Sequence, residues 1–78
     1  MRVHLGGHLA WHDPQKRAWI EIDQVAPISL IDLACHLGLP LAEIAVVAVN
    51  RRTVALDDTL VSDTDRVEFF PPLGGGGK

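Results

Sequence analysis

The sequence predicts an α+β fold in which a mixed β-sheet packs against one main helix. Three observations predict it: two segments with strand-like alternation open the chain, one segment with helical spacing follows, and three apolar segments separated by turn residues complete it. A chain of 78 residues has the length of one domain. We expect two layers, because one stripe of a helix and one face of a sheet can bury each other.

The first two strands are expected at residues 2–11 and 17–23. Apolar and more polar side chains alternate through the first, with Gly6-Gly7 indicating a twist or bulge. The apolar positions of these two strands are Val3, Leu5, Leu9, Trp11, Ala18, Ile20 and Ile22. Residues 12–16, HDPQK, are expected as a turn that begins at Asp13-Pro14, so that the two strands form a hairpin.

A helix is expected after Pro27, with Ser29 as its N-cap. Apolar residues follow with the spacing of an amphipathic helix. They are Leu30, Leu33, Ala34 and Leu37. Gly38 is expected to end the helix, and Pro40 prevents it from resuming.

Three further strands are expected in the second half. Residues 44–50 are apolar at both alternating sets of positions, which is typical of a strand inside a sheet. Residues 50–53, NRRT, predict a tight turn, because Asn tolerates positive φ. A short strand is expected at 53–56, an acidic loop at 57–65, and the last strand at 66–70.

This β-β-α-β-β-β order is the β-grasp, or ubiquitin-like, pattern, and we assign it to residues 1–70. Residues 71–78, PPLGGGGK, form a Pro/Gly tail in this interpretation. Four consecutive glycines cannot hold a fold, since each loses much backbone freedom on ordering and has no side chain to pack. The tail is therefore expected to be used for its narrow cross-section, since glycine has no side chain.

Composition limits the function classes. A net charge of −3 argues against nucleic-acid binding. Cys35 is the only cysteine, which excludes an intrachain disulfide and a cysteine-ligated cluster. The longest apolar run, residues 44–49, is too short to span a bilayer, and the opening MRVHLGGH lacks a signal peptide's apolar stretch. We expect a cytoplasmic protein with no membrane partner.

The second half carries a specific resemblance. Residues 48–54 read AVNRRTV, residues 63–72 read DTDRVEFFPP, and glycines follow. In these features the chain resembles the MoaD/ThiS family of sulfur-carrier proteins, whose pattern is a V-N-x-x-x-V turn, a D-G-D-x-V strand entry, F-P-P-x and a terminal Gly-Gly. Thr64 stands where the family has Gly. The FFPP stretch favours the small subunit of molybdopterin synthase over the thiamine-pathway carrier.

The resemblance implies a carrier with no catalytic residues of its own. An adenylyltransferase of the ubiquitin-activating type would use ATP to adenylate the terminal glycine, and sulfur would displace AMP to leave a thiocarboxylate. A synthase, such as the molybdopterin synthase large subunit, would accept the sulfur. The tail glycines that this chemistry would use are Gly74, Gly75, Gly76 and Gly77. No bound cofactor and no metal are expected.

Strand alternation predicts the surface beside the tail. Val67 and Phe69 should share one face of the last strand, and Glu68 and Phe70 the other. Phe70 is then a candidate docking anchor on the solvent face, whereas the alternative places both aromatic rings in the core. The remaining candidate partner contacts are Pro71, Pro72, Leu73, Arg51 and Arg52.

The chain ends in Lys78, whereas the family ends in Gly. We expect a protease, of the deubiquitinase metalloprotease type, to expose Gly76 or Gly77. A cloning remnant and a carrier that has lost activity are the alternatives.

Two other functions remain open at this stage. A protein modifier would use the same activated glycine to form isopeptide bonds. A plain β-grasp binding module would not need its tail.

Other clusters are interpreted structurally. His4, His8 and His12 are expected as solvent-face residues of a strand, on which successive histidines lie too far apart to share a metal. Cys35 is expected as a small apolar or half-buried helix residue and not as a catalytic one, since its helix neighbour His36 cannot face it. The aspartates between positions 57 and 65 lack the spacing of a calcium loop and are expected to form turns.

Overall fold

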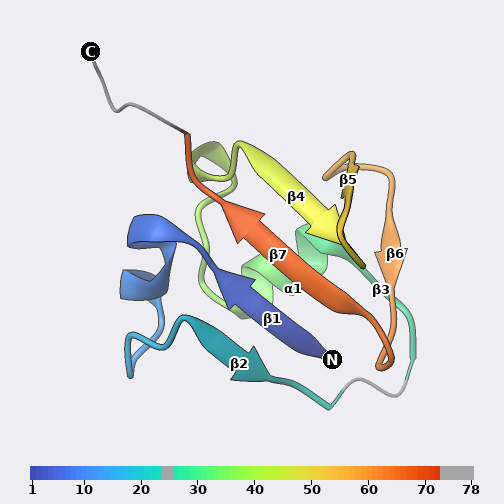
Figure 1. Cartoon of the computed structure of the whole chain (residues 1–78), viewed down its shortest axis with the longest axis horizontal. Helices are drawn as coiled ribbons and strands as arrows, with labels where there is room; N and C mark the ends of the chain where they lie inside the picture. The colour runs from blue at the N-terminus through green and yellow to red at the C-terminus, as the bar shows by residue number, and fades with distance from the viewer. Residues whose placement is uncertain (24–25, 73–78) are drawn as a thin grey trace.

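The computed structural model describes residues 1–23 and 26–72. Its main sheet has five strands in the order β2-β1-β7-β4-β5 (Figure 1). They are β1 (Arg2–Leu5), β2 (Trp19–Glu21), β4 (Val46–Val49), β5 (Arg52–Val54) and β7 (Arg66–Phe70). β1 and β7 are parallel, and the other neighbours are antiparallel. The predicted α+β fold, with a mixed β-grasp sheet on one main helix, is confirmed.

Helix α1 (Leu30–His36) covers one face of this sheet (Figure 1). The Ser29 side chain caps it by accepting a hydrogen bond of 3.0 Å from the Asp32 backbone N–H. Gly38 ends it with φ of +74°. Leu30, Leu33 and Ala34 are buried and Leu37 is half-buried, so the predicted apolar stripe is confirmed. No helix in the described part of the chain is long and apolar enough to cross a membrane.

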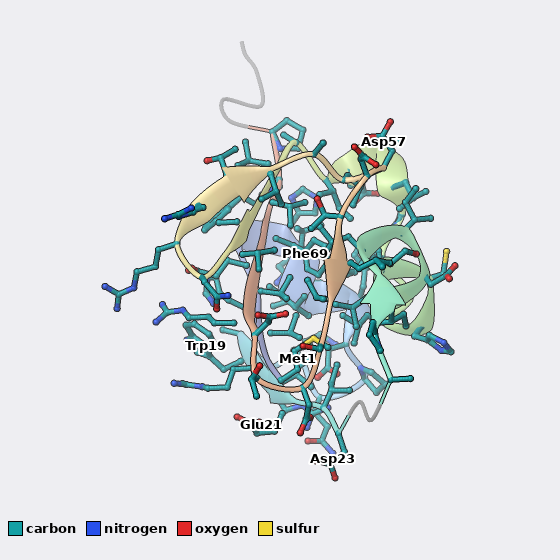
Figure 2. All side chains as sticks on the ribbon, turned by 90° about the vertical axis from the view of Figure 1, so that its right-hand side faces the viewer. Met1, Trp19, Glu21, Asp23, Asp57 and Phe69 are labelled. Carbon is teal, nitrogen blue, oxygen red and sulfur yellow. The ribbon has the colours of Figure 1, made fainter. Side chains whose placement is uncertain are left out.

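The core lies between α1 and the sheet. Phe69, on the middle strand β7, is fully buried at its centre, whereas Trp19 lies on the opposite side of the sheet (Figure 2). The other large side chains with less than 2% exposure are Leu5, Leu9, Leu30, Leu33, Val3, Val61 and Val67. Most of these come from β1, β7 and α1, so the core is built around the strand that precedes the tail.

The expected strand over residues 2–11 is wrong beyond Leu5. Residues Gly7–His12 form a 3₁₀ helix, η1, with buried Leu9 and Ala10 and with Trp11 74% exposed. β1 pairs with β7 up to Leu5 opposite Phe69. Continued parallel pairing would meet the prolines after Phe70, which have no N–H to donate, so the chain turns away. The antiparallel pairing of β1 with β2 is confirmed, but η1 lies within their connection.

Two further segments differ from expectation. The loop expected at 57–65 contains β6 (Leu60–Val61), which pairs with β3 (Ile28–Ser29) in a separate two-stranded sheet. A short 3₁₀ helix, η2 (Leu41–Glu43), precedes β4. β4 has a strand on each side, as predicted, but Val46 is 42% exposed. Its second face is therefore not buried.

The predicted tight turn at NRRT is confirmed. Asn50 and Arg51 have φ of 51° and 69°, and they join β4 to β5 as a two-residue loop. The Asn50 side chain donates to Asp65 Oδ1 at 2.9 Å and accepts from the Arg66 backbone N–H at 3.0 Å. These bonds fix the start of β7 against the β4–β5 hairpin.

Asp13 fixes the turn that precedes β2, which was predicted to begin at Asp13-Pro14. Its buried carboxylate accepts backbone hydrogen bonds of 3.0 Å from Gln15 and Arg17. The Arg17 guanidinium binds both carboxylate oxygens, at 3.0 and 3.1 Å. These bonds, led by the one from the Arg17 side chain, lower the pKa of Asp13 from 3.8 to about 2.

Replacing Asp13 with Asn should remove an acid-dependent part of the stability. The folded pKa lies below the ordinary value, so ionised Asp13 stabilises the fold above pH 3.8, and this contribution is lost as the pH falls through about 2. Thermal unfolding midpoints measured from neutral pH to about pH 2 should fall more steeply for the wild type than for Asp13→Asn. At neutral pH the variant should be less stable, whereas Asp58→Asn, at an exposed position, should match the wild type. Parallel pH curves would contradict this assignment.

Candidate functional site at the carboxyl end of the last strand

β7 ends at Phe70, immediately before the expected tail, and its last two residues are hydrogen-bonded to the chain on either side. The Gly6 N–H donates to the Phe69 carbonyl oxygen at 2.8 Å, and the Ala45 N–H donates to the Phe70 carbonyl oxygen at 2.8 Å. Pro71 follows, with its φ restricted by the ring. The point and direction at which the chain leaves the sheet are therefore set by the β1 side and the β4 side together.

The two aromatic residues of β7 face opposite sides of the sheet. Phe69 is fully buried with Val67, whereas Phe70 is half-buried on the face away from α1. The predicted alternation is present, and Phe70 is not part of the core. The His4 ring centroid lies 5.9 Å from that of Phe70, and the exposed Val46 is its partner on β4. Phe70 and Val46 thus form an apolar surface beside Pro71.

A cluster on the same outer face was not predicted from the sequence. The Trp19 ring lies 4.6 Å from the His4 ring centroid, and the guanidinium carbons of Arg2 and Arg66 lie 4.6 and 4.9 Å from the indole centroid. These are cation–π distances. Alternation along β2, which buries Ile20, was the signal that would have placed Trp19 on this face. His4 is half-buried within the cluster rather than on an open solvent face.

The interpretation of His8 and His12 as strand residues is wrong, because both belong to η1. Their Nε2 atoms lie 2.9 and 3.1 Å from the same oxygen, Glu43 Oε1 on η2. These hydrogen bonds, first from His12 and then from His8, lower the pKa of Glu43. The described residues hold no group of three or more His, Cys, Asp or Glu side chains suited to a metal ion. Through these two hydrogen bonds His8 and His12 link η1 to η2, and the two short helices lie on either side of the end of β7.

The candidate partner contacts are not all brought together. Phe70 and Pro71 are adjacent and half-buried, and Pro72 is exposed. Arg51 and Arg52 are exposed and lie at the other end of the sheet. β4 runs antiparallel to β7, so the loop that follows β4 lies beside Arg66 at the start of β7. A partner would have to cover the length of β7 to contact both groups.

Several predicted positions lie outside the described residues. These are Leu73, Gly74, Gly75, Gly76, Gly77 and Lys78.

Cys35 is exposed rather than half-buried. Asp65 accepts a hydrogen bond from the Ser62 backbone N–H at 2.8 Å, which agrees with the turn-forming role expected for the aspartates.

Comparison with known proteins adds one match. Residues 9–76 match the family model described as the ThiS family. The match begins after β1 and extends over the helix, the whole of β7 and most of the tail. Among curated proteins, no match to this chain is found.

Proposed function

The chain belongs to the ThiS family of sulfur carriers in cofactor biosynthesis, and on that premise we propose that its C-terminal glycine is adenylated and then converted to a thiocarboxylate. A carboxylate is a poor electrophile and needs a leaving group before sulfur can attack it. Attack of the terminal carboxylate on ATP would release pyrophosphate and form the acyl adenylate. Sulfide from a donor would then displace AMP. The chain is the co-substrate in both steps, and the partner supplies the catalysis.

Among the described residues, the end of β7 gives the strongest support for this proposal. The last two carbonyl groups of β7 are hydrogen-bonded from opposite sides, and the chain leaves the sheet at Pro71 immediately afterwards. An acyl adenylate must be protected from water, so a chain end has to enter a closed site through a narrow channel. A rigid strand end followed by prolines and glycines suits this task, because prolines restrict the direction and glycines add no side-chain width.

We further propose the small subunit of molybdopterin synthase as the carrier type. The sequence basis is FFPP at residues 69–72. The partners would be an adenylyltransferase of the ubiquitin-activating type and the large synthase subunit. Purified chain loaded with sulfur and combined with the large synthase subunit should convert a molybdopterin precursor. Combined with a thiazole synthase, it should not support thiazole formation. The opposite preference would assign it to thiamine synthesis.

The experiment that tests the carrier function combines the chain with its adenylyltransferase, ATP and a sulfide donor. Mass spectrometry should show a gain of one sulfur minus one oxygen on the C-terminal peptide. Deletion of residues 74–78 should abolish this gain. High-mass conjugates on a blot, without the sulfur gain, would favour a protein modifier. Full activity of the deletion variant in the host would favour a binding module that does not use its tail.

Replacing Phe70 with Ala should weaken docking to the adenylyltransferase. Phe70 is half-buried beside exposed Val46, and an aromatic ring at the centre of an interface often contributes strongly to binding. We expect the KM for the carrier in pyrophosphate exchange to rise by about tenfold. Leu60→Ala is the matched control, since Leu60 is 69% exposed but belongs to the separate β3–β6 sheet. An unchanged KM for Phe70→Ala would refute the docking role.

A further inference from the structure

The glycine pair, Gly6 and Gly7, contacts the residues at which the chain leaves the sheet. A Cβ atom added to Gly6 would lie 3.0 Å from the Phe69 carbonyl oxygen and 3.0 Å from Cδ1 of Phe70. A Cβ atom added to Gly7 would lie 2.8 Å from Cγ of Pro71. Ordinary van der Waals contact begins at 3.4 Å. A methyl group at Gly7 therefore requires the Pro71 ring to shift, and one at Gly6 requires its neighbours to move by a few tenths of an ångström.

Backbone conformation alone does not explain the pair. Gly6 has φ of −74° and ψ of 152°, a region that any residue adopts. Gly7 has φ of +51°, which favours glycine, and so does Gly38 with φ of +74°. A Cβ at Gly38 would meet nothing within 4 Å. Gly6 is thus constrained by its neighbours, Gly38 by its backbone, and Gly7 by both.

The segment that contains the glycine pair is held in place from several directions. The Gly6 N–H bonds to the Phe69 carbonyl oxygen, and Leu9 in η1 is fully buried. His8 and His12 bind Glu43 on η2. Because η1 is fixed in this way, a side chain added at Gly7 would be accommodated mainly by displacing the Pro71 ring.

We propose that Gly6 and Gly7 are positioning residues that set the direction in which the tail leaves the body, and that this direction governs how productively the terminal glycine reaches the adenylating site. The inference rests on the proposed carrier function. Gly6 and Gly7 lie near the N-terminus, whereas the reacting group is at the C-terminus. Their effect on the reaction would pass through the contact between Gly7 and Pro71.

A change in direction should affect turnover more than docking. Moving Pro71 Cγ from 2.8 Å to at least 3.4 Å from the new Cβ redirects a tail whose reacting end lies several residues further on. Misplacement of a reacting group by about 1 Å can cost about a hundredfold in rate. Since the outer face of the sheet is unchanged, we expect kcat for adenylation to fall by about tenfold and KM to stay within about twofold.

The test compares Gly7→Ala with Gly38→Ala in pyrophosphate exchange, using the C-terminal form with which the wild type is active. Both substitutions place Ala at positive φ, so both should lower the unfolding midpoint, and Gly7→Ala should lower it further because its methyl group meets the Pro71 ring. Only Gly7→Ala should lower kcat. Pro71→Ala removes the Cγ atom that the new methyl group would meet, so Gly7→Ala/Pro71→Ala should return to the kcat of Pro71→Ala alone. Equal kcat values for Gly7→Ala and Gly38→Ala, or no rescue in the double variant, would overturn the inference.

A measurement without the partner separates this inference from the proposed function. The backbone amide shift of Phe70 in ¹⁵N-labelled protein should move in Gly7→Ala and return in the double variant towards its value in Pro71→Ala. If the wild type forms no acyl adenylate, the carrier function fails, and unchanged amide shifts in Gly7→Ala separately refute the contact. Gly6→Ala, which carries no backbone strain, serves if Gly7→Ala does not fold. It should also lower kcat, and because its methyl group meets the Phe70 ring it should raise KM as well.

Discussion

Chains shortened to end at Gly76 or Gly77 should be adenylated about a hundredfold faster than the chain that ends at Lys78. The reason is steric and electrostatic. In the chain that ends at Lys78 the terminal carboxylate belongs to a residue with a long cationic side chain, which a channel of glycine width would not admit. The family match ends at residue 76, within the glycine run. Pyrophosphate exchange on the three purified forms measures the difference.

A fourth form separates length from side chain. Lys78→Gly keeps the full length but removes the cationic group. If the side chain is the obstacle, this variant should react like the shortened chains, whereas a length requirement would leave it inactive. Equal rates for all forms would remove the need for trimming.

A separate measurement tests the proposed processing protease. If trimming occurs, protein isolated from its native host should carry a C-terminal glycine, as measured by mass spectrometry of the intact chain. A mature form that retains Lys78 in cells with an active pathway would refute both trimming and a cloning remnant, and would leave a carrier that has lost its activity as the explanation.

Local sequence signals predicted most of the main sheet and the helix. Ser29 caps α1 and Gly38 ends it, because capping and positive φ are decided by residues within one turn of the chain. The two-residue loop at Asn50 and Arg51 was predictable for the same reason. β7 matches the predicted range 66–70, because its alternation is bounded by Asp65 and Pro71.

The elements that were missed depend on contacts between distant residues. η1 forms where β1 loses its partner, since the prolines after β7 cannot continue the ladder, and nothing within residues 2–11 reports this. β3 and β6 have two residues each, too few to show a period. The bridge from His8 and His12 to Glu43 could not be predicted once those histidines were assigned to a strand.

The candidate site also has one part that local sequence patterns predicted and one part that depends on contacts between distant residues. The outer-face position of Phe70 was predicted from the sequence, because strand alternation is a local pattern. The role of the tail glycines is likewise a prediction from a local sequence pattern. The glycine pair was interpreted only as a twist or bulge, since its contact with Phe70 and Pro71 exists only after β1 and β7 have paired.

Replacing Phe69 with Ala should cost about 3–5 kcal/mol of unfolding free energy, the largest stability effect that we expect. The ring is fully buried on the middle strand, where its neighbours across the ladders are Leu5 and Val47. Domains of this size have about 5–15 kcal/mol in total, so the variant should be close to unfolding at physiological temperature. Urea denaturation should show a lower midpoint with little change in the m-value.

Phe70→Ala is the matched control, because it removes the same ring from the next residue of the same strand but from the half-buried face. We expect it to cost about 1 kcal/mol. Equal losses for the two variants would contradict the assignment of Phe69 to the core and Phe70 to the outer face.

The two substitutions should separate folding from docking. At low temperature, where Phe69→Ala remains partly folded, activity per folded molecule should equal that of the wild type, because the outer face and the contact of Gly7 with Pro71 do not include the Phe69 side chain. Phe70→Ala should remain folded and should bind the adenylyltransferase more weakly. A strand that alternates in this way supports the core with one ring and presents the other beside the point where the tail begins, so the position of the tail depends on the stability of the whole sheet.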